Sequence, residues 1–231
     1  MDSAGQTEQT RRFFDMAAAG WTARYGSDAA VGARKARFLS AVQTRFDRPA
    51  DILDFGCGSG DIALHLSNAG HRLTGYDLSP QMIAQAQQVD RDHRVQWVAR
   101  GDNEDLPFAD ASFHAVVASS VLEYVANLDA TLKELARVLR PGGWLIVTVP
   151  DMRHPVRHRE RWLRAALTVP GLASLVQYSS WREGANYLQI SINRVPPKEW
   201  AKRLRSYDFN PDQITNSVAP LLMITSQRIA R

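Results

Sequence analysis

One acidic side chain and three glycines at alternate positions lie between residues 54 and 60, in a spacing that suits a small charged ligand. Asp54 is followed by Gly56, Gly58 and Gly60. Because glycine lacks Cβ, the backbone can turn sharply there and bring its amide groups close to a ligand. A dinucleotide site needs the pattern G-x-G-x-x-G, but the third glycine comes one position early and Asp54 would repel a pyrophosphate. A ligand that carries both an ammonium and a carboxylate group suits these residues better.

A second acid, Asp77, follows at the distance expected of a nucleotide-binding fold, about 20 residues beyond the glycines. It ends a predicted strand over residues 71–77. An acid at such a strand end can accept hydrogen bonds from both hydroxyls of a ribose, although it can also serve only as a capping or loop acid. Ser79 and Pro80 follow as a helix N-cap and first helical residue.

These residues resemble the D-x-G-x-G-x-G signature of class I S-adenosylmethionine-dependent methyltransferases. The resemblance implies that the glycine turn packs against the methionine part of the cofactor and that Asp77 binds its ribose. Residues 101–108 resemble the family's G-D-x-x-x-L-P-F segment, which reaches the adenine edge. The implied cofactor-binding residues are Asp54, Gly56, Gly58, Gly60, Asp77, Leu78, Asp102, Asn103 and Ser119. The resemblance covers residues 51–150 closely and the flanks loosely.

The chain departs from the family at the segment after the fourth predicted strand. The family commonly has L-E-H there, whereas this chain has Leu122, Glu123 and Tyr124. A histidine base that titrates near neutral pH is therefore missing from that position. The catalytic residue is unknown from the sequence, with Tyr124, His154 and Tyr178 as candidates.

The elements that must position these residues form an α/β pattern. Apolar runs predict strands at residues 52–55, 71–77, 95–98, 112–120, 144–149, 212–217 and 221–228. Helices are predicted from residue 10 through Tyr25 and over residues 31–46, 79–88, 127–139 and 197–207, with another opening at Asp61 and residues 1–10 frayed. The expected fold is a doubly wound, mostly parallel seven-stranded sheet with N-terminal helices and an inserted lid, within a single domain. Its parts are an N-terminal helical cover (1–48), a cofactor-binding core (49–150), a substrate lid (151–196) and a C-terminal helix with two strands that complete the core (197–231).

The predicted lid is rich in arginine and aromatic residues. Three interpretations remain open for its basic residues: a solvated helix face, a site for an anionic acceptor, or a membrane-surface helix for a lipid-linked one. The candidates for contact with the acceptor are Trp21, Tyr25, Arg157 and Trp181. Trp21 and Tyr25 can equally be ordinary packing residues.

Composition limits the remaining choices. The 231 residues carry a net charge of +4, which is too small to indicate nucleic acid as a partner. A single cysteine favours a reducing cytoplasm, and no apolar run is long enough for a transmembrane helix. No spacing of His, Cys, Asp and Glu indicates a metal site, and the oligomeric state is left open.

The predicted function is methyl transfer from S-adenosylmethionine to a small molecule, with oxygen as the first choice of acceptor atom. The protein would act mainly by positioning the acceptor for in-line displacement. One alternative is an RNA methyltransferase that uses the basic segment 153–164, although no N/D-P-P-Y motif follows the fourth strand. The other is a non-catalytic binding protein of the same fold, which the intact acids and glycines disfavour.

Overall fold

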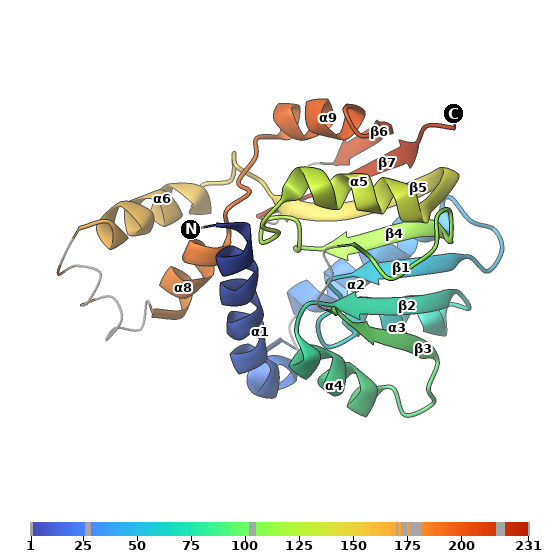
Figure 1. Ribbon diagram of the computed structural model, residues 1–231, viewed down its shortest axis with the longest axis horizontal. Coiled ribbons are helices and arrows are strands. Elements are labelled where there is room, and N and C mark those ends of the chain that lie inside the picture. Colours follow the sequence, from blue (N-terminus) through green and yellow to red (C-terminus); the bar gives the residue numbers. More distant parts are fainter. Residues whose placement is uncertain are drawn as a thin grey trace.

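The computed structural model describes residues 2–25, 29–101, 105–169, 171, 175, 182–215 and 220–230. Its centre is a seven-stranded sheet of order β3-β2-β1-β4-β5-β7-β6 (Figure 1). The strands are β1 (Asp51–Phe55), β2 (Arg72–Asp77), β3 (Val95–Ala99), β4 (Phe113–Ser119), β5 (Leu139–Pro150), β6 (Phe209–Thr215) and β7 (Leu221–Arg228). β1 to β5 are parallel, and β7 is antiparallel to both β5 and β6. The expected doubly wound, mostly parallel sheet is confirmed.

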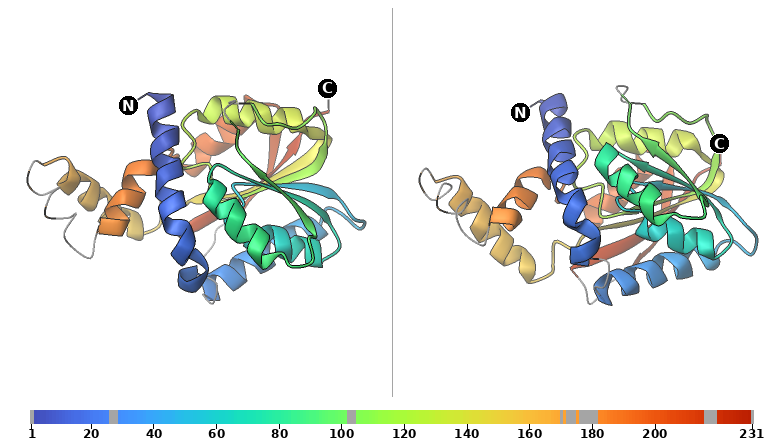
Figure 2. Two further views of the ribbon diagram at one scale, coloured as in Figure 1. Left: turned by 60° about the horizontal axis from the view of Figure 1, so that its bottom comes forward. Right: turned by 90° about the horizontal axis from the view of Figure 1, so that it is seen from below.

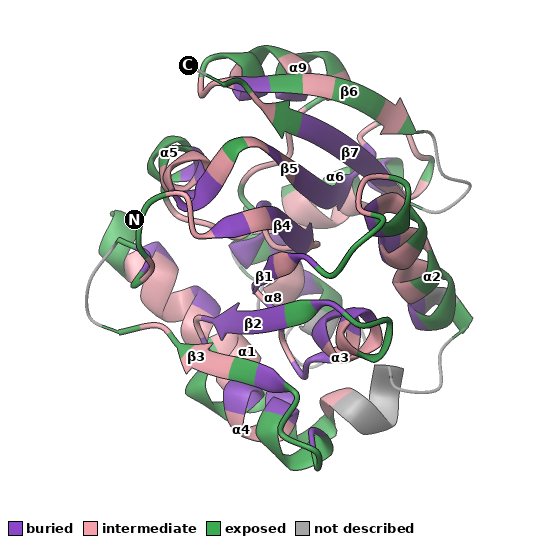
Figure 3. Ribbon diagram, turned by 90° about the vertical axis from the view of Figure 1, so that its right-hand side faces the viewer, coloured by how far each residue is buried: buried purple, intermediate pink, exposed green. Residues whose placement is uncertain are grey.

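Helices pack on both faces of the sheet and beyond the end at which its parallel strands finish (Figure 1). They are α1 (Ser3–Tyr25), α2 (Ala29–Gln43), α3 (Asp61–Asn68), α4 (Pro80–Val89), α5 (Leu128–Val138), α6 (Val156–Leu167), α8 (Arg182–Ile190) and α9 (Pro197–Arg205). Successive residues of a strand point to opposite faces, so Leu53 joins one apolar core with α5 and α9 while Ile52 joins the other with α2 and α3. The strands in the middle of the sheet are correspondingly buried (Figure 3).

The N-terminus differs from expectation, because α1 begins at Ser3 and the prediction of frayed residues 1–10 is wrong. Asp2 Oδ1 accepts the Gly5 N–H at 2.8 Å, as a helix cap does. Gln6 is buried, and its Nε2 donates to the Ile190 carbonyl of α8 at 3.0 Å. A tertiary contact with a distant segment therefore orders a stretch that is too polar to be predicted as helix.

Two strands also begin earlier than predicted. β5 starts at Leu139, which pairs with Phe113, and the pairing resumes at Trp144 opposite Ala115. Residues 140–143, which lie between the predicted helix over residues 127–139 and the predicted strand over residues 144–149, thus form an irregular start to the strand. β6 starts at Phe209, whose side chain is fully buried in the core.

The segment after β5 projects beyond one end of the sheet (Figure 1). Its helices α6 and α8 pack against each other, and Arg164 Nη2 of α6 donates to the carbonyls of Leu188 and Ser191 at 2.7 and 2.5 Å. α1 runs between this segment and α4 and contacts α4 and α8 (Figure 2). α1 therefore lies along the edge of the sheet at which the parallel strands end.

Candidate functional site

The glycine turn connects β1 to α3, and its three glycines have left-handed backbone conformations. The φ angles of Gly56, Gly58 and Gly60 are 72°, 53° and 86°. A Cβ on Gly56 would lie 2.4 Å from Val121 Cγ2, and one on Gly60 would lie 2.5 Å from Trp97 Cη2. A Cβ on Gly58 would meet nothing within 4 Å among the described residues. Gly56 and Gly60 therefore let the chain pack on itself, and Gly58 alone of the three faces open space.

Asp77 lies beside this turn, as expected. Its Oδ2 accepts the Gly58 N–H and its Oδ1 accepts the Ser79 N–H, both at 2.8 Å. Leu78, which lies between Asp77 and Ser79 in the sequence, is half-buried. Burial raises the pKa of Asp77 to about 6, although the two backbone donors act in the opposite direction. The carboxylate keeps further acceptor capacity, which a ligand with two adjacent hydroxyls can use.

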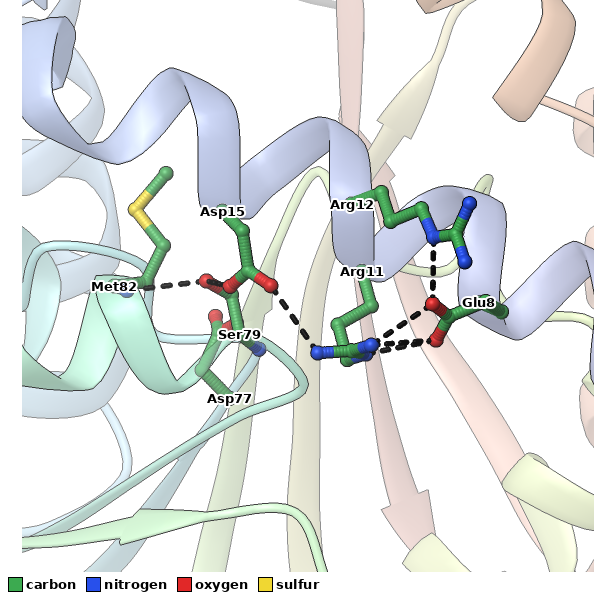
Figure 4. A network of polar contacts seen from close by, with 7 residues as sticks. All are labelled: Glu8, Arg11, Arg12, Asp15, Asp77, Ser79 and Met82. Atoms are coloured by element: carbon green, nitrogen blue, oxygen red, sulfur yellow. Dashed lines mark hydrogen bonds and ion pairs between the residues drawn. The ribbon is translucent and has the colours of Figure 1, made fainter.

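α1 reaches the same turn (Figure 4). Ser79 Oγ donates to Asp15 Oδ1 at 2.5 Å and accepts the Met82 N–H at 3.1 Å, so one hydroxyl both caps α4 and binds α1. Asp15 Oδ2 in turn accepts from Arg11 Nη1 at 3.3 Å. α1 is thus hydrogen-bonded to a residue two positions after Asp77.

Asp54 is the most buried acid of the turn, with a 1% exposed side chain. Its Oδ2 has no hydrogen-bond partner among the described residues, while Ala63 N–H donates to the carboxyl group. Burial, followed by repulsion from Asp77, raises the pKa of Asp54 to about 8. A cation placed beside Asp54 would stabilise the carboxylate. This unpaired oxygen, together with the open face of Gly58, fits a ligand with a positive charge.

The carboxyl end of β4 supplies a second group of unpaired polar atoms. Ser119 Oγ and Ser120 Oγ are buried without a hydrogen-bond partner in the part of the chain that the structure describes. Ser120 has a φ of 58° and donates its N–H to the Thr148 carbonyl at 3.1 Å. A left-handed non-glycine residue at a strand end is typical of a functional turn. Ser119 therefore lies where the sequence predicts contact with a ligand.

Aromatic rings from three segments meet over this edge. The Tyr124 ring lies 5.3 Å from Phe14 of α1 and 5.9 Å from Tyr187 of α8, in edge-to-face contacts. Phe14 also contacts Trp21 at 6.0 Å, so Trp21 belongs to the same group. Burial raises the pKa of the Tyr124 phenol. Tyr124 consequently stays protonated at neutral pH and can donate a hydrogen bond, but it is a poor base.

Beside these rings lies a buried acid that the sequence did not single out. Glu123 is fully buried, and neither carboxylate oxygen has a hydrogen-bond partner among the described residues. Burial raises the pKa of Glu123 to about 7; its own backbone N–H opposes the rise most, followed by the charges of Arg194, Arg157 and Arg34. Glu123 is the middle residue of the segment compared with L-E-H, and that comparison indicates only a missing histidine. What distinguishes Glu123 is its three-dimensional surroundings.

Comparisons with known proteins agree with this geometry. A family model described as a methyltransferase domain matches residues 53–147. A demethylmenaquinone methyltransferase from Chlorobaculum parvum is 33% identical over 171 residues, which cover 73% of this chain and 67% of that protein. The chain belongs to the class I S-adenosylmethionine-dependent methyltransferase family.

Two further proteins resemble this methyltransferase over most of its length. A ubiquinone/menaquinone biosynthesis C-methyltransferase from Nitrobacter hamburgensis is 33% identical over 174 residues, 71% of this chain and 68% of that protein. The structure of a 1,6-didemethyltoxoflavin-N1-methyltransferase from Burkholderia thailandensis has a TM-score of 0.68, with 22% identity, 99% of this chain covered and 91% of that chain. This second likeness shows the fold.

The methyltransferase uses S-adenosylmethionine as its cofactor. The cofactor supplies a methyl group on a positively charged sulfur and also carries an ammonium group. The unpaired oxygen of Asp54, the open face of Gly58 and the free acceptor capacity of Asp77 fit these features. Cys57 is buried in the same turn, where burial raises the pKa of its thiol, and it packs as a small apolar residue.

Several predicted site residues lie outside the described part of the chain or make contacts within the protein. Asp102, Asn103, Tyr178 and Trp181 lie outside the described residues, as does the side chain of Tyr25. Arg157 is 5% exposed, and its guanidinium donates to Glu160 Oε1 at 2.6 Å and to the Pro220 carbonyl at 2.5 Å. It therefore holds α6 against the end of the sheet and offers no free charge to an acceptor. His154 precedes α6, and its Nδ1 accepts the Val156 N–H at 3.3 Å.

The described residues hold no group of three or more His, Cys, Asp and Glu side chains that could bind a metal ion. Within the same residues, no helix has the length and apolar character that crossing a bilayer requires.

Proposed function

We propose that this methyltransferase transfers a methyl group to a hydroxylated aromatic ring of the quinol class. The observation that carries the proposal is the group of Phe14, Tyr124 and Tyr187 rings beside the unpaired carboxyl of Glu123. Aromatic rings bind a planar acceptor by edge and face contacts, and a buried carboxyl is a partner for its hydroxyl. Relatives named as demethylmenaquinone and ubiquinone/menaquinone methyltransferases support the same acceptor class.

The acceptor atom is either the hydroxyl oxygen or a ring carbon next to it. Oxygen is the choice from the sequence, whereas the relative named as a C-methyltransferase favours carbon. Both reactions begin with the loss of a proton from the hydroxyl, because this loss raises the electron density on the oxygen and on the adjacent ring carbons. One proton-accepting group of the protein would therefore serve methyl transfer to oxygen and to carbon alike.

The test is a methyl-transfer assay with S-adenosylmethionine that carries a carbon-13 methyl group. Chemically reduced 1,4-naphthoquinone, with and without a prenyl side chain, and 1-naphthol serve as acceptors. Mass spectrometry should show one added labelled methyl, and its carbon-13 shift separates a methoxy product from a ring-methyl product. Transfer to no hydroxylated ring, by an enzyme that binds S-adenosylhomocysteine, would contradict the proposal.

The structure weakens the case for an RNA substrate. Two arginines of the basic segment, Arg157 and Arg164, are committed to contacts within the protein. They cannot contribute to a phosphate track. Transfer of label to total RNA with a steep dependence on salt would restore that alternative. Cofactor binding with transfer to no small molecule and no RNA would favour the non-catalytic interpretation.

A further inference from the structure

We propose that Glu123 is the general base that removes the hydroxyl proton of the acceptor, and that Arg194 stabilises the resulting oxygen anion. This inference rests on the proposed function, because it requires an acceptor with a hydroxyl on an aromatic ring. Neither residue was a candidate from the sequence.

The first support is a contrast between two glutamates, Glu123 and the partly buried Glu160, that interact with the same arginines. Glu160 Oε1 accepts from Arg157 at 2.6 Å and its Oε2 pairs with Arg194. These two pairings together outweigh desolvation, so the pKa of Glu160 is lowered. Glu123 is more deeply buried and has neither pairing within the described residues. A buried acid with a purely structural role is normally hydrogen-bonded, as Glu160 is. The unpaired acid is thus the one that has capacity for a ligand.

The second support is the unused donor capacity of Arg194. Its side chain is 10% exposed, and only Nη1 is engaged, with Glu160. Nε and Nη2 are buried without partners in the described part of the chain, and so is Ser191 Oγ nearby in sequence. Because the charge of Arg194 acts on Glu123, these unpartnered donors and the Glu123 carboxyl are available to one polar ligand.

The third support is the way the backbone fixes the two segments together. The Asn193 N–H donates to the Glu123 carbonyl at 3.0 Å, and Asn193 Nδ2 donates to the carbonyls of Leu122 and Val125 at 2.9 and 2.7 Å. These bonds hold the loop after β4 against the residues that precede α9. Glu123 and Arg194 are consequently held in one rigid framework, as a base and an anion-binding group must be.

The proposed step balances without a further reactant. The acceptor O–H bond breaks, its electron pair stays on oxygen and the proton moves to a carboxylate oxygen of Glu123. The electron-rich oxygen or adjacent ring carbon then forms a bond to the methyl group, while the electron pair of the carbon–sulfur bond remains on sulfur. With a carbon acceptor, the ring C–H proton is lost afterwards to water, and Glu123 returns its proton to solvent before the next turnover.

The titration of Glu123 suits this role. The groups that act on it are Tyr124 on its own loop, Tyr187 of α8, Arg34 of α2, Arg157 of α6 and Arg194 before α9. Together with burial they leave its pKa at about 7, close to the value at which a base works best at neutral pH. The ionised fraction therefore rises between about pH 6 and pH 8.

The test compares Glu123→Gln and Glu123→Asp with Glu199→Gln, a matched change at an exposed acid of α9. With the naphthoquinol acceptor, Glu123→Gln should lower kcat by roughly 100-fold or more, because general-base catalysis contributes about that factor. Glu123→Asp should restore part of the rate. The rise of kcat around pH 7 should disappear in Glu123→Gln and remain in Glu199→Gln. The affinity for S-adenosylhomocysteine should stay within twofold in all three variants.

An infrared measurement gives a readout that needs no acceptor. In the S-adenosylhomocysteine complex, the wild type should show the C=O band of a protonated carboxyl that decreases from pH 6 to pH 8. Subtraction of the Glu123→Gln spectrum separates this band from those of Asp54 and Asp77. A Glu123 carboxyl that does not change its ionisation in this range overturns the proposal.

The two possible failures are distinguishable. A wild type that methylates the quinol, with Glu123→Gln equally active over the whole pH range, leaves the proposed function standing and overturns Glu123 as base. A wild type that binds the cofactor but methylates no hydroxylated ring overturns the proposed function. The infrared titration then still decides whether Glu123 changes protonation state near neutral pH.

Discussion

Gly58 and Gly60 share a left-handed backbone conformation but need it for different reasons. Gly58 faces open space, whereas a side chain on Gly60 would collide with Trp97. Gly58→Val should abolish binding of S-adenosylmethionine, since its side chain would fill the space that the cofactor needs, at a stability cost of about 1–2 kcal/mol from the backbone strain. Gly60→Ala adds overpacking of about 1–3 kcal/mol to that strain and should chiefly destabilise the fold. Calorimetric titration and urea unfolding of both variants measure the two effects. Equal losses of stability would contradict the distinction.

Asp77 is expected to hold the ribose of the cofactor. Asp77→Ala should weaken cofactor affinity by roughly 1.5–3 kcal/mol, which is the range for a buried hydrogen-bond partner left unpaired. Calorimetry with S-adenosylhomocysteine measures the change, and circular dichroism checks that the fold is retained. An unchanged affinity would mean that other residues hold the ribose.

The glycines and Asp77 could be predicted because their chemistry depends on local backbone geometry and on spacing along the chain. Glu123 could not be identified in this way. Its unpaired state arises because Arg157 and Arg194, which come from two distant segments, are both bound to Glu160. Arg157 and Glu160 are three residues apart on one helix, which the sequence can suggest, but no local pattern predicts that Arg194 also pairs with Glu160 rather than with Glu123.

Local sequence patterns have the same limit in predicting the helices. The helix over residues 127–139 is strongly amphipathic, and Leu128, Leu132, Leu135 and Val138 are buried as expected. The start of α1 has no such apolar face, and it is ordered by a cap at Asp2 and by contact with α8. Periodicity therefore predicted α5 and the part of α1 from residue 10 onward, and it missed the first residues of α1, which polar contacts fix.

The basic residues of α6 should divide into two classes. Arg157→Met removes the bonds from α6 to Glu160 and to the Pro220 carbonyl, so it should accelerate proteolysis within residues 151–196. Arg159 and Arg161 are exposed, so their joint replacement by Ala should change stability by no more than about 0.5 kcal/mol, the usual range for surface substitutions. If the acceptor is anionic, the double variant should raise its KM at low salt, and the difference should vanish at high salt. Proteolysis and steady-state kinetics at two ionic strengths check both expectations. Kinetics identical to wild type would show that these two arginines form only a solvated face.

At the scale of the whole molecule, the buried carboxyls make stability depend on pH in an unusual direction. The pKa values of Asp54, Glu123 and Asp77 are raised to about 8, 7 and 6 in the folded chain. A raised pKa means that the folded state binds the proton more tightly than the unfolded state. The stabilising contribution is therefore complete below the unfolded pKa of about 4 and is lost progressively as the pH rises from there through the folded values.

The ligand-free methyltransferase should accordingly lose stability between about pH 7 and 8.5, by on the order of 1 kcal/mol from Asp54. Asp54→Asn should flatten this dependence. The positively charged cofactor should oppose it, because it stabilises the ionised carboxylate. Urea unfolding at several pH values, with and without S-adenosylmethionine, measures the three cases. A wild type whose stability stays constant over this range would exclude a protonated Asp54.

The bond between Asp15 and Ser79 has a consequence for the order of events in a catalytic cycle. Because α1 is tied to the turn that carries Asp77, we expect the used cofactor to leave only after this helix moves away from α4. The helix should delay the exit of S-adenosylhomocysteine more than it delays the chemical step, so that product dissociation limits turnover. Asp15→Ala removes the acceptor of the Ser79 hydroxyl. It should then release S-adenosylhomocysteine faster in a stopped-flow chase and show a higher steady-state rate, while the rate of a single turnover stays the same.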